Sequence, residues 1–212
     1  MDDSVKLQKS DSEVDLDLRK QYQSGLGGTM FPMLLTRLDV AFVVGKLLRY
    51  ASNPTTAHYN CFIRLLRYLR LTIDYGVEFH PHAGKEDLEM LGKIAGFVDA
   101  DYANCLDTRR STTGYLFMIA NGPISWLSKL QSTVTMSTCE AEYNAISMAG
   151  REAIWLIYLL ELIGLGGVRP MVLYTDSETA MKLAENFYLS TRSKYIDITV
   201  HWIREALYEG KL

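Results

Sequence analysis

The sequence is poor in cysteine and proline, with three and five of them in 212 residues. Cys61, Cys105 and Cys139 lie far apart and outside any C-x-x-C pattern, which argues against a disulfide framework and against a structural zinc site. A long apolar run is also missing, so we expect neither a membrane span nor a signal peptide. The chain is therefore expected to be intracellular, in the cytoplasm or the nucleus, with no membrane partner.

An excess of basic charge is missing as well. Twenty-two Lys and Arg against 25 Asp and Glu give a net charge of -3, which excludes a uniformly basic protein that coats nucleic acid. Any nucleic-acid surface must therefore be local. With 48% apolar residues the chain can bury a core, and its length suits one domain or one domain with an appendage.

The pattern of apolar residues divides the chain into segments. Apolar spacing predicts two helices, 37–51 and 55–71, which Asn53 and Pro54 separate into a hairpin. Turn formers and charges after His80 predict a linker. The predicted organisation is a disordered lead-in (1–21), a helical connection segment (22–80), a linker (81–93) and an α/β domain (94–212).

A basic segment without any acid lies between residues 40 and 73. Aromatic residues are interleaved with its basic residues, a combination that favours nucleic-acid binding by Arg49, Arg64, Arg67 and Arg70. The alternative, which stays open, is a solvated face of an amphipathic helix.

Residues after 92 form shorter runs typical of strands. The predicted order is three strands, a long helix, a fourth strand and two helices, which indicates a mixed sheet flanked by helices. Ser137 to Glu140 has the spacing of a capping box and opens the long helix. The predicted strands are 94–100, 114–120, 124–128 and 171–175, and the predicted helices run from 137 to about 163, from about 178, and from about 199 to 208.

Three acids break the apolar pattern of their own elements. Asp99 and Asp176 each end a strand where a buried strand would continue with an apolar residue. Glu142 shares a helical stripe with apolar residues at offsets of three, four, seven and eleven, so it is expected to face the sheet. If the two strands are neighbours, the three carboxylates converge.

Three converging carboxylates repel one another, and a divalent cation is the simplest neutraliser. Ligands that are all oxygen favour Mg²⁺ or Mn²⁺, and two such ions support phosphodiester cleavage. The alternative reading takes Asp99 and Asp176 as caps or turn formers and Glu142 as an exposed helix acid.

The strings around these acids resemble the ribonuclease H domain of copia-type LTR retrotransposon Pol polyproteins. RRST-x-GY together with EAEY is a specific combination, and residues 36–79 resemble the connection that precedes this domain. The matching strings are GFVDADYA (96–103), DTRRSTTGYLFMIANGPISWLSKLQSTVTMSTCEAEYNAIS (107–147), EAIWL (152–156), LYTDSETAMKLAEN (173–186) and TRSKYIDITVHWIRE (191–205).

The resemblance implies a ribonuclease H-like fold that cuts the RNA strand of an RNA–DNA hybrid with two metal ions. It implies Asp99, Glu142 and Asp176 as catalytic metal ligands, and the remainder of a reverse transcriptase as a further partner. The family's last strand and helix, with a fourth carboxylate, are expected to be absent from this sequence. Asp197 is an acid near that region, as a substitute ligand or in a structural role, and the family's usual His is Tyr195 here.

Two other functions stay open. The chain is expected to be an impaired ribonuclease H. The first alternative is a catalytically inactive remnant that binds nucleic acid, and the second is an effector. Arg64-Leu65-Leu66-Arg67 is an R-x-L-R tetrapeptide, the only feature that suggests a secreted effector or interaction protein.

Overall fold

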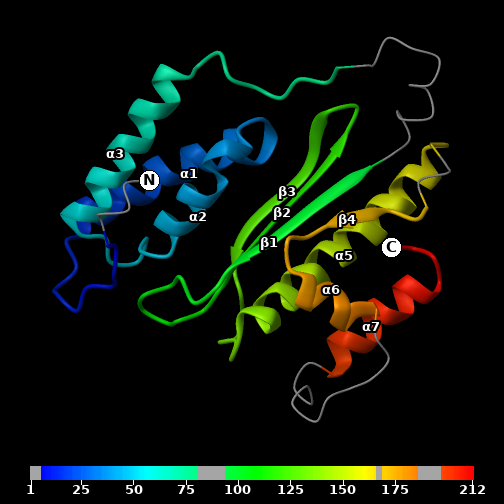
Figure 1. Cartoon of the computed structure of the whole chain (residues 1–212). Coiled ribbons are helices and arrows are strands. Elements are labelled where there is room, and N and C mark those ends of the chain that lie inside the picture. Colours follow the sequence, from blue (N-terminus) through cyan, green and yellow to red (C-terminus); the bar gives the residue numbers. More distant parts are fainter. Residues whose placement is uncertain (1–5, 81–93, 166–168, 186–196) are drawn as a thin grey trace. The chain divides into compact units, whose positions relative to one another are not determined.

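The computed structural model describes residues 6–80, 94–165, 169–185 and 197–212, without the side chains of 185 and 197–201. The chain divides into two compact units (Figure 1). The helical unit contains the residues up to Val77 together with Leu106–Thr108, and the sheet unit contains Glu78–Cys105 and Arg109–Leu212. The expected linker 81–93 lies outside the described residues.

From residue 6 onward the helical unit contains three α-helices and one 3-10 turn: α1 (Leu16–Leu35), the turn η1 (Leu38–Val40), α2 (Ala41–Leu48) and α3 (Thr56–Leu71). The helices α2 and α3 correspond to the expected hairpin. The core of the unit is formed by Leu7, Tyr22, Leu26, Val40, Val44, Leu47, Tyr50, Phe62 and Leu65.

The structure differs from the disordered lead-in that the sequence predicts over residues 1–21: Leu7 lies in the core of the unit, and α1 begins at Leu16. Asp15 caps α1 by accepting hydrogen bonds from the backbone N–H groups of Asp17 and Leu18 at 3.1 and 3.0 Å. Three glycines and Pro32 lie inside this helix and lower its intrinsic propensity, so its sequence does not read as helical. Tertiary packing decides instead, because Tyr22 and Leu26 are fully buried.

The sheet unit contains a four-stranded mixed sheet in the order β3-β2-β1-β4. Its strands are β1 (Ala95–Asp101), β2 (Thr112–Ile119), β3 (Gly122–Leu130) and β4 (Val172–Tyr174). The β1 strand pairs antiparallel with β2 and parallel with β4. The β2–β3 hairpin turns at Ala120 and Asn121, which have φ of 47° and 58°, the positive values that a tight primed turn needs.

Among its described residues the sheet unit also contains three helices: α5 (Thr138–Leu162), α6 (Glu178–Glu185) and α7 (Asp197–Tyr208). The long helix α5 packs along the sheet, and α6 and α7 pack against it (Figure 1). Alternation along β1 buries Val98 and Ala100 under α5 and leaves Phe97 exposed on the opposite face. All three tryptophans of the chain belong to this unit: Trp126, Trp155 and Trp202.

Within the described ranges the protein is thus an α/β protein with six α-helices and one four-stranded mixed sheet, in agreement with the predicted class. None of the helices seen there combines the length and the apolar character needed to cross a bilayer.

Candidate metal centre

Asp99 and Asp176 lie side by side because β1 and β4 are parallel neighbours. The register pairs Phe97 with Tyr174. Asp99 and Asp176 each lie two residues further along the chain, so both reach the same edge of the sheet. Both side chains are exposed. Asp99 is oriented by its own strand, since its Oδ1 accepts a hydrogen bond from the backbone N–H of Ala100 at 2.8 Å.

Glu142 approaches the two aspartates from α5. The helix begins after Ser137, whose Oγ accepts a hydrogen bond from the backbone N–H of Glu140 at 3.1 Å. The residues on the stripe expected from the sequence, Ala145, Ile146, Ala149 and Ala153, are all buried. Glu142 itself is half-buried, so its position at the end of this stripe points its side chain toward the sheet.

One carboxylate oxygen from each of Asp99, Glu142 and Asp176 lies within 4.8 Å of the other two. The structure therefore brings together the three acids that the sequence singled out. Three separate elements supply them, so the group exists only in the folded sheet unit.

The surroundings of Glu142 disfavour the ionised form of its carboxyl group. Burial raises the pKa of Glu142 to about 7, and the negative charges of Asp99 and Asp176 act in the same direction, while the backbone N–H of Ala100 opposes them. Within the described part of the chain, the buried Oε2 of Glu142 has no hydrogen-bond partner. An unpartnered oxygen beside two more carboxylates is a donor set that fits Mg²⁺ or Mn²⁺.

Buried hydrogen bonds hold the start of α5 against the strands. Nε2 of Gln131 donates to Oγ1 of Thr113 at 3.0 Å and to the carbonyl of Ala141 at 2.9 Å. The hydroxyls of Ser111 and Thr135 share a hydrogen bond at 3.0 Å. Sequence reasoning did not single out these residues. In the sequence they are polar residues at the ends of strands, a pattern that is also typical of ordinary loops.

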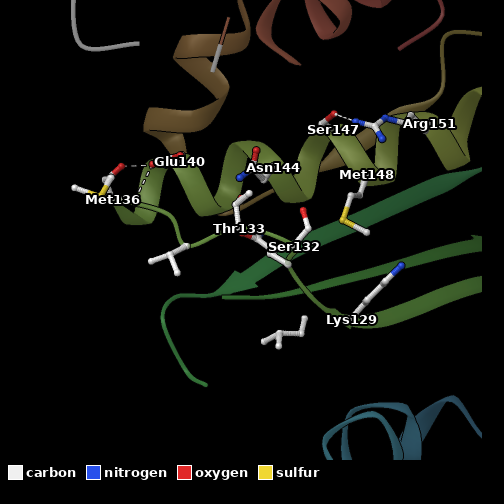
Figure 2. A pocket seen from close by; sticks show the side chains of 13 residues that line it. Lys129, Ser132, Thr133, Met136, Glu140, Asn144, Ser147, Met148 and Arg151 are labelled. Carbon is white, nitrogen blue, oxygen red and sulfur yellow. Dashed lines mark hydrogen bonds between the residues drawn. The ribbon is translucent and has the colours of Figure 1, made fainter. Parts of the chain in front are cut away.

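A hollow of about 1090 Å³ lies beside the N-terminal half of α5 (Figure 2). Asn144 and Arg151 face it from the helix, and Ser132 and Thr133 from the loop after β3. None of the three acids lines this hollow. Glu142 lies two residues from Asn144 and therefore on another side of the helix.

The basic residues proposed from the sequence lie in the helical unit. Arg64, Arg67 and Arg70 are exposed along α3, at spacings of three residues. Arg49 is half-buried at the C-terminal end of α2. Leu65, inside the R-x-L-R tetrapeptide, is only 4% exposed and belongs to the core of the unit. The tetrapeptide is therefore part of a packed helix.

Asp197 is the first residue of α7, and its side chain is not among those described. Its role as a substitute ligand therefore stays a prediction.

Comparison with known proteins relates the chain to transposon proteins. It is 40% identical over 191 residues to the retrovirus-related Pol polyprotein from transposon TNT 1-94 of Nicotiana tabacum, which covers 90% of the chain. It is 34% identical over 188 residues to the corresponding polyprotein from transposon RE2 of Arabidopsis thaliana. The chain spans only 14% and 12% of the lengths of these two polyproteins. No family model matches the chain.

A shorter relative is matched over nearly its whole length. It is the secreted RxLR effector protein 161 of Plasmopara viticola, which is 45% identical over 135 residues. The match covers 64% of the chain and 90% of that protein. The chain therefore belongs to the family of this short protein, and it is also similar to a segment of the retrovirus-related Pol polyproteins of transposons.

Proposed function

We propose that the sheet unit is a ribonuclease H-type nuclease that hydrolyses the RNA strand of RNA–DNA hybrids with the help of Mg²⁺ or Mn²⁺. The observation that carries this proposal is the convergence of Asp99, Glu142 and Asp176 within 4.8 Å. The similarity to retrovirus-related Pol polyproteins supports a function derived from a transposon. The strings RRST-x-GY and EAEY support the assignment to the copia type and to its ribonuclease H region.

In this proposal the three acids hold the metal site from two sides, the sheet and the helix. Divalent cations held by Asp99, Glu142 and Asp176 would supply an activated water and would stabilise the leaving oxygen of the cleaved phosphodiester. Asp99 and Asp176 hold their carboxylates at the sheet edge, and Glu142 closes the site from the helix. Because the pKa of Glu142 is raised to about 7, this residue is only partly ionised at neutral pH, and it would act as a ligand in its deprotonated form.

The helical unit contributes a substrate contact to this proposal. Arg64, Arg67 and Arg70 form an exposed basic stripe, and Arg49 lies in the same unit. Such a stripe binds phosphates of the hybrid without reading its bases, and a ribonuclease of this type recognises the hybrid by shape and by 2′-OH groups.

Cleavage of a radiolabelled RNA–DNA hybrid tests the proposal. We expect cutting of the RNA strand with Mg²⁺ or Mn²⁺, none with EDTA, and none of a DNA duplex of the same sequence. Asp99→Asn should abolish cutting, because it removes a ligand of the site. Asp101→Asn is the matched control. Asp101 is an exposed acid two residues further along β1 that accepts a hydrogen bond from the side-chain amide of Asn104, and its replacement should leave cutting unchanged.

Two results would contradict the proposal. A folded chain that binds the hybrid but does not cut it would favour the inactive nucleic-acid-binding remnant. Equal cutting by the Asp99→Asn and Asp101→Asn variants would place the chemistry elsewhere. The effector alternative has a relative with that name in its favour, but the buried Leu65 leaves the tetrapeptide in a packed helix.

A further inference from the structure

We infer that Gln131 is a positioning residue that sets the separation between Asp99 and Glu142. The inference rests on the proposed function of the three acids as metal ligands. Gln131 directly follows β3 and is only 4% exposed. Its backbone N–H donates to the carbonyl of Ser111 at 2.8 Å, so both its backbone and its side chain are fixed.

The two hydrogen bonds of the Gln131 amide end next to two of the metal ligands. On the strand side the acceptor is Oγ1 of Thr113, which lies opposite Ala100 in the β1–β2 register. The neighbouring pair in that register is Asp99 with Gly114. On the helix side the acceptor is the carbonyl of Ala141, the peptide group that leads directly into Glu142. One side chain thus bridges the surroundings of both acids.

The bridge is buried at both ends, which makes its loss costly. Thr113 and Ala141 are fully buried, so an acceptor left without its partner there costs free energy. The Gln131 amide thereby holds the start of α5, which leads into Glu142, against β2, the strand that pairs with β1 beside Asp99.

Gln131→Met tests the inference, because methionine has a similar length but cannot donate the two hydrogen bonds. Calorimetric titration of the full chain with Mn²⁺ alone should show affinity reduced about 10–100-fold, the usual effect of losing an outer partner of a metal ligand. Hybrid cleavage should show a lower kcat at an unchanged KM. Thr113→Val removes only the strand-side acceptor and serves if the first variant does not fold.

Ser125→Ala is the matched control. It removes another hydrogen bond between β3 and α5, from Oγ of Ser125 to Oε1 of Glu152 at 2.6 Å, ten residues along the helix from Glu142. A general loosening of the helix would weaken Mn²⁺ binding in both variants. Only Gln131→Met should weaken it if positioning is the cause.

Each outcome decides the inference. Mn²⁺ affinity that is equal in Gln131→Met and in the unchanged chain overturns it, and so does equal weakening in Ser125→Ala. If the unchanged chain binds Mn²⁺ but cuts no hybrid, the proposed function fails while the affinity comparison still judges Gln131. If the unchanged chain binds no Mn²⁺, the proposed metal site is wrong. A crystal structure of Gln131→Met then tests the inference by itself, because an unchanged separation of Asp99 and Glu142 overturns it.

Discussion

Glu142 differs from an ordinary surface glutamate because its ionised form lies beside two other acids and partly out of water. Its pKa is raised to about 7. A carboxyl that holds its proton more tightly in the folded chain stabilises the fold below the pKa of the unfolded chain, about 4.3. This contribution is lost as the pH rises toward 7. Without a metal the site therefore carries a cost at neutral pH, which the proposed cation would remove.

Replacing Glu142 with Gln should reveal this cost. In EDTA, the free energy of unfolding of the unchanged chain should fall relative to that of Glu142→Gln by about 1–3 kcal/mol between pH 5 and pH 8. Denaturant unfolding at the two pH values measures the difference. Mn²⁺ should restore the stability of the unchanged chain and leave the variant unaffected. A difference that is the same at both pH values would argue against strained ionisation of Glu142.

The three acids were predictable because each one breaks a regular pattern. Asp99 and Asp176 interrupt apolar strand patterns, although β1 continues to Asp101 and Asp176 lies just beyond β4. Glu142 lies on a stripe of alanines and isoleucine, so each acid is visible as a polar residue against an apolar pattern. Gln131 breaks no pattern, since a glutamine after a strand looks like the start of a loop. Its importance depends on which residues lie across from it, and this information exists only in three dimensions.

Among the elements, α1 shows how packing can outweigh helix propensity. Gly25 lies so close to α3 that an added Cβ would be 2.3 Å from Cζ of Phe62. By contrast, Gly27 and Gly28 have nothing within 4 Å of such an atom. The same residue type is thus required at one position of the helix and only costly at the other two.

Alanine substitutions in α1 should therefore have opposite effects. Gly25→Ala should lower the free energy of unfolding by about 1–3 kcal/mol, because the methyl group forces α1 away from Phe62. Gly27→Ala and Gly28→Ala should raise it by up to about 1 kcal/mol through better helix propensity. Denaturant unfolding of the three variants is the measurement. Stabilisation by Gly25→Ala would show that the two helices are not in such close contact.

The elements that the sequence predicted well are those with a clear period or a cap. The helix from Ser137 and the strands around Val98 and Leu173 follow local patterns, and the structure contains them with shifts of a few residues at their ends. The order of the sheet could not be read from these patterns. It depends on β1 pairing with β4 across 70 intervening residues, a contact that no local pattern encodes.

For the whole molecule, the separation of charges between the units has a measurable effect. The three acids belong to the sheet unit and the arginine stripe of α3 to the helical unit, in a chain whose net charge is only -3. Binding of a hybrid should therefore depend on salt through the helical unit and on metal through the sheet unit.

The double variant Arg67→Gln/Arg70→Gln tests this division. We expect weaker hybrid binding and a slope of log K against log salt that is shallower by about 2, since two phosphate contacts are lost. Cutting at saturating hybrid should be unchanged. The charge-matched control Lys6→Gln/Lys9→Gln changes two exposed lysines of the same unit and should keep the original slope. Equal slopes for both variants would remove the stripe from the substrate contact.

The placement of Trp126, Trp155 and Trp202 in the sheet unit gives the chain a built-in optical label. Tryptophan fluorescence excited at the red edge of its absorption arises from the sheet unit alone, because the helical unit contains tyrosine but no tryptophan. Far-ultraviolet circular dichroism, in contrast, records helices of both units. Following both signals through one denaturant titration thus shows, without cutting or labelling the chain, whether the unit that carries the acids melts together with its neighbour or on its own.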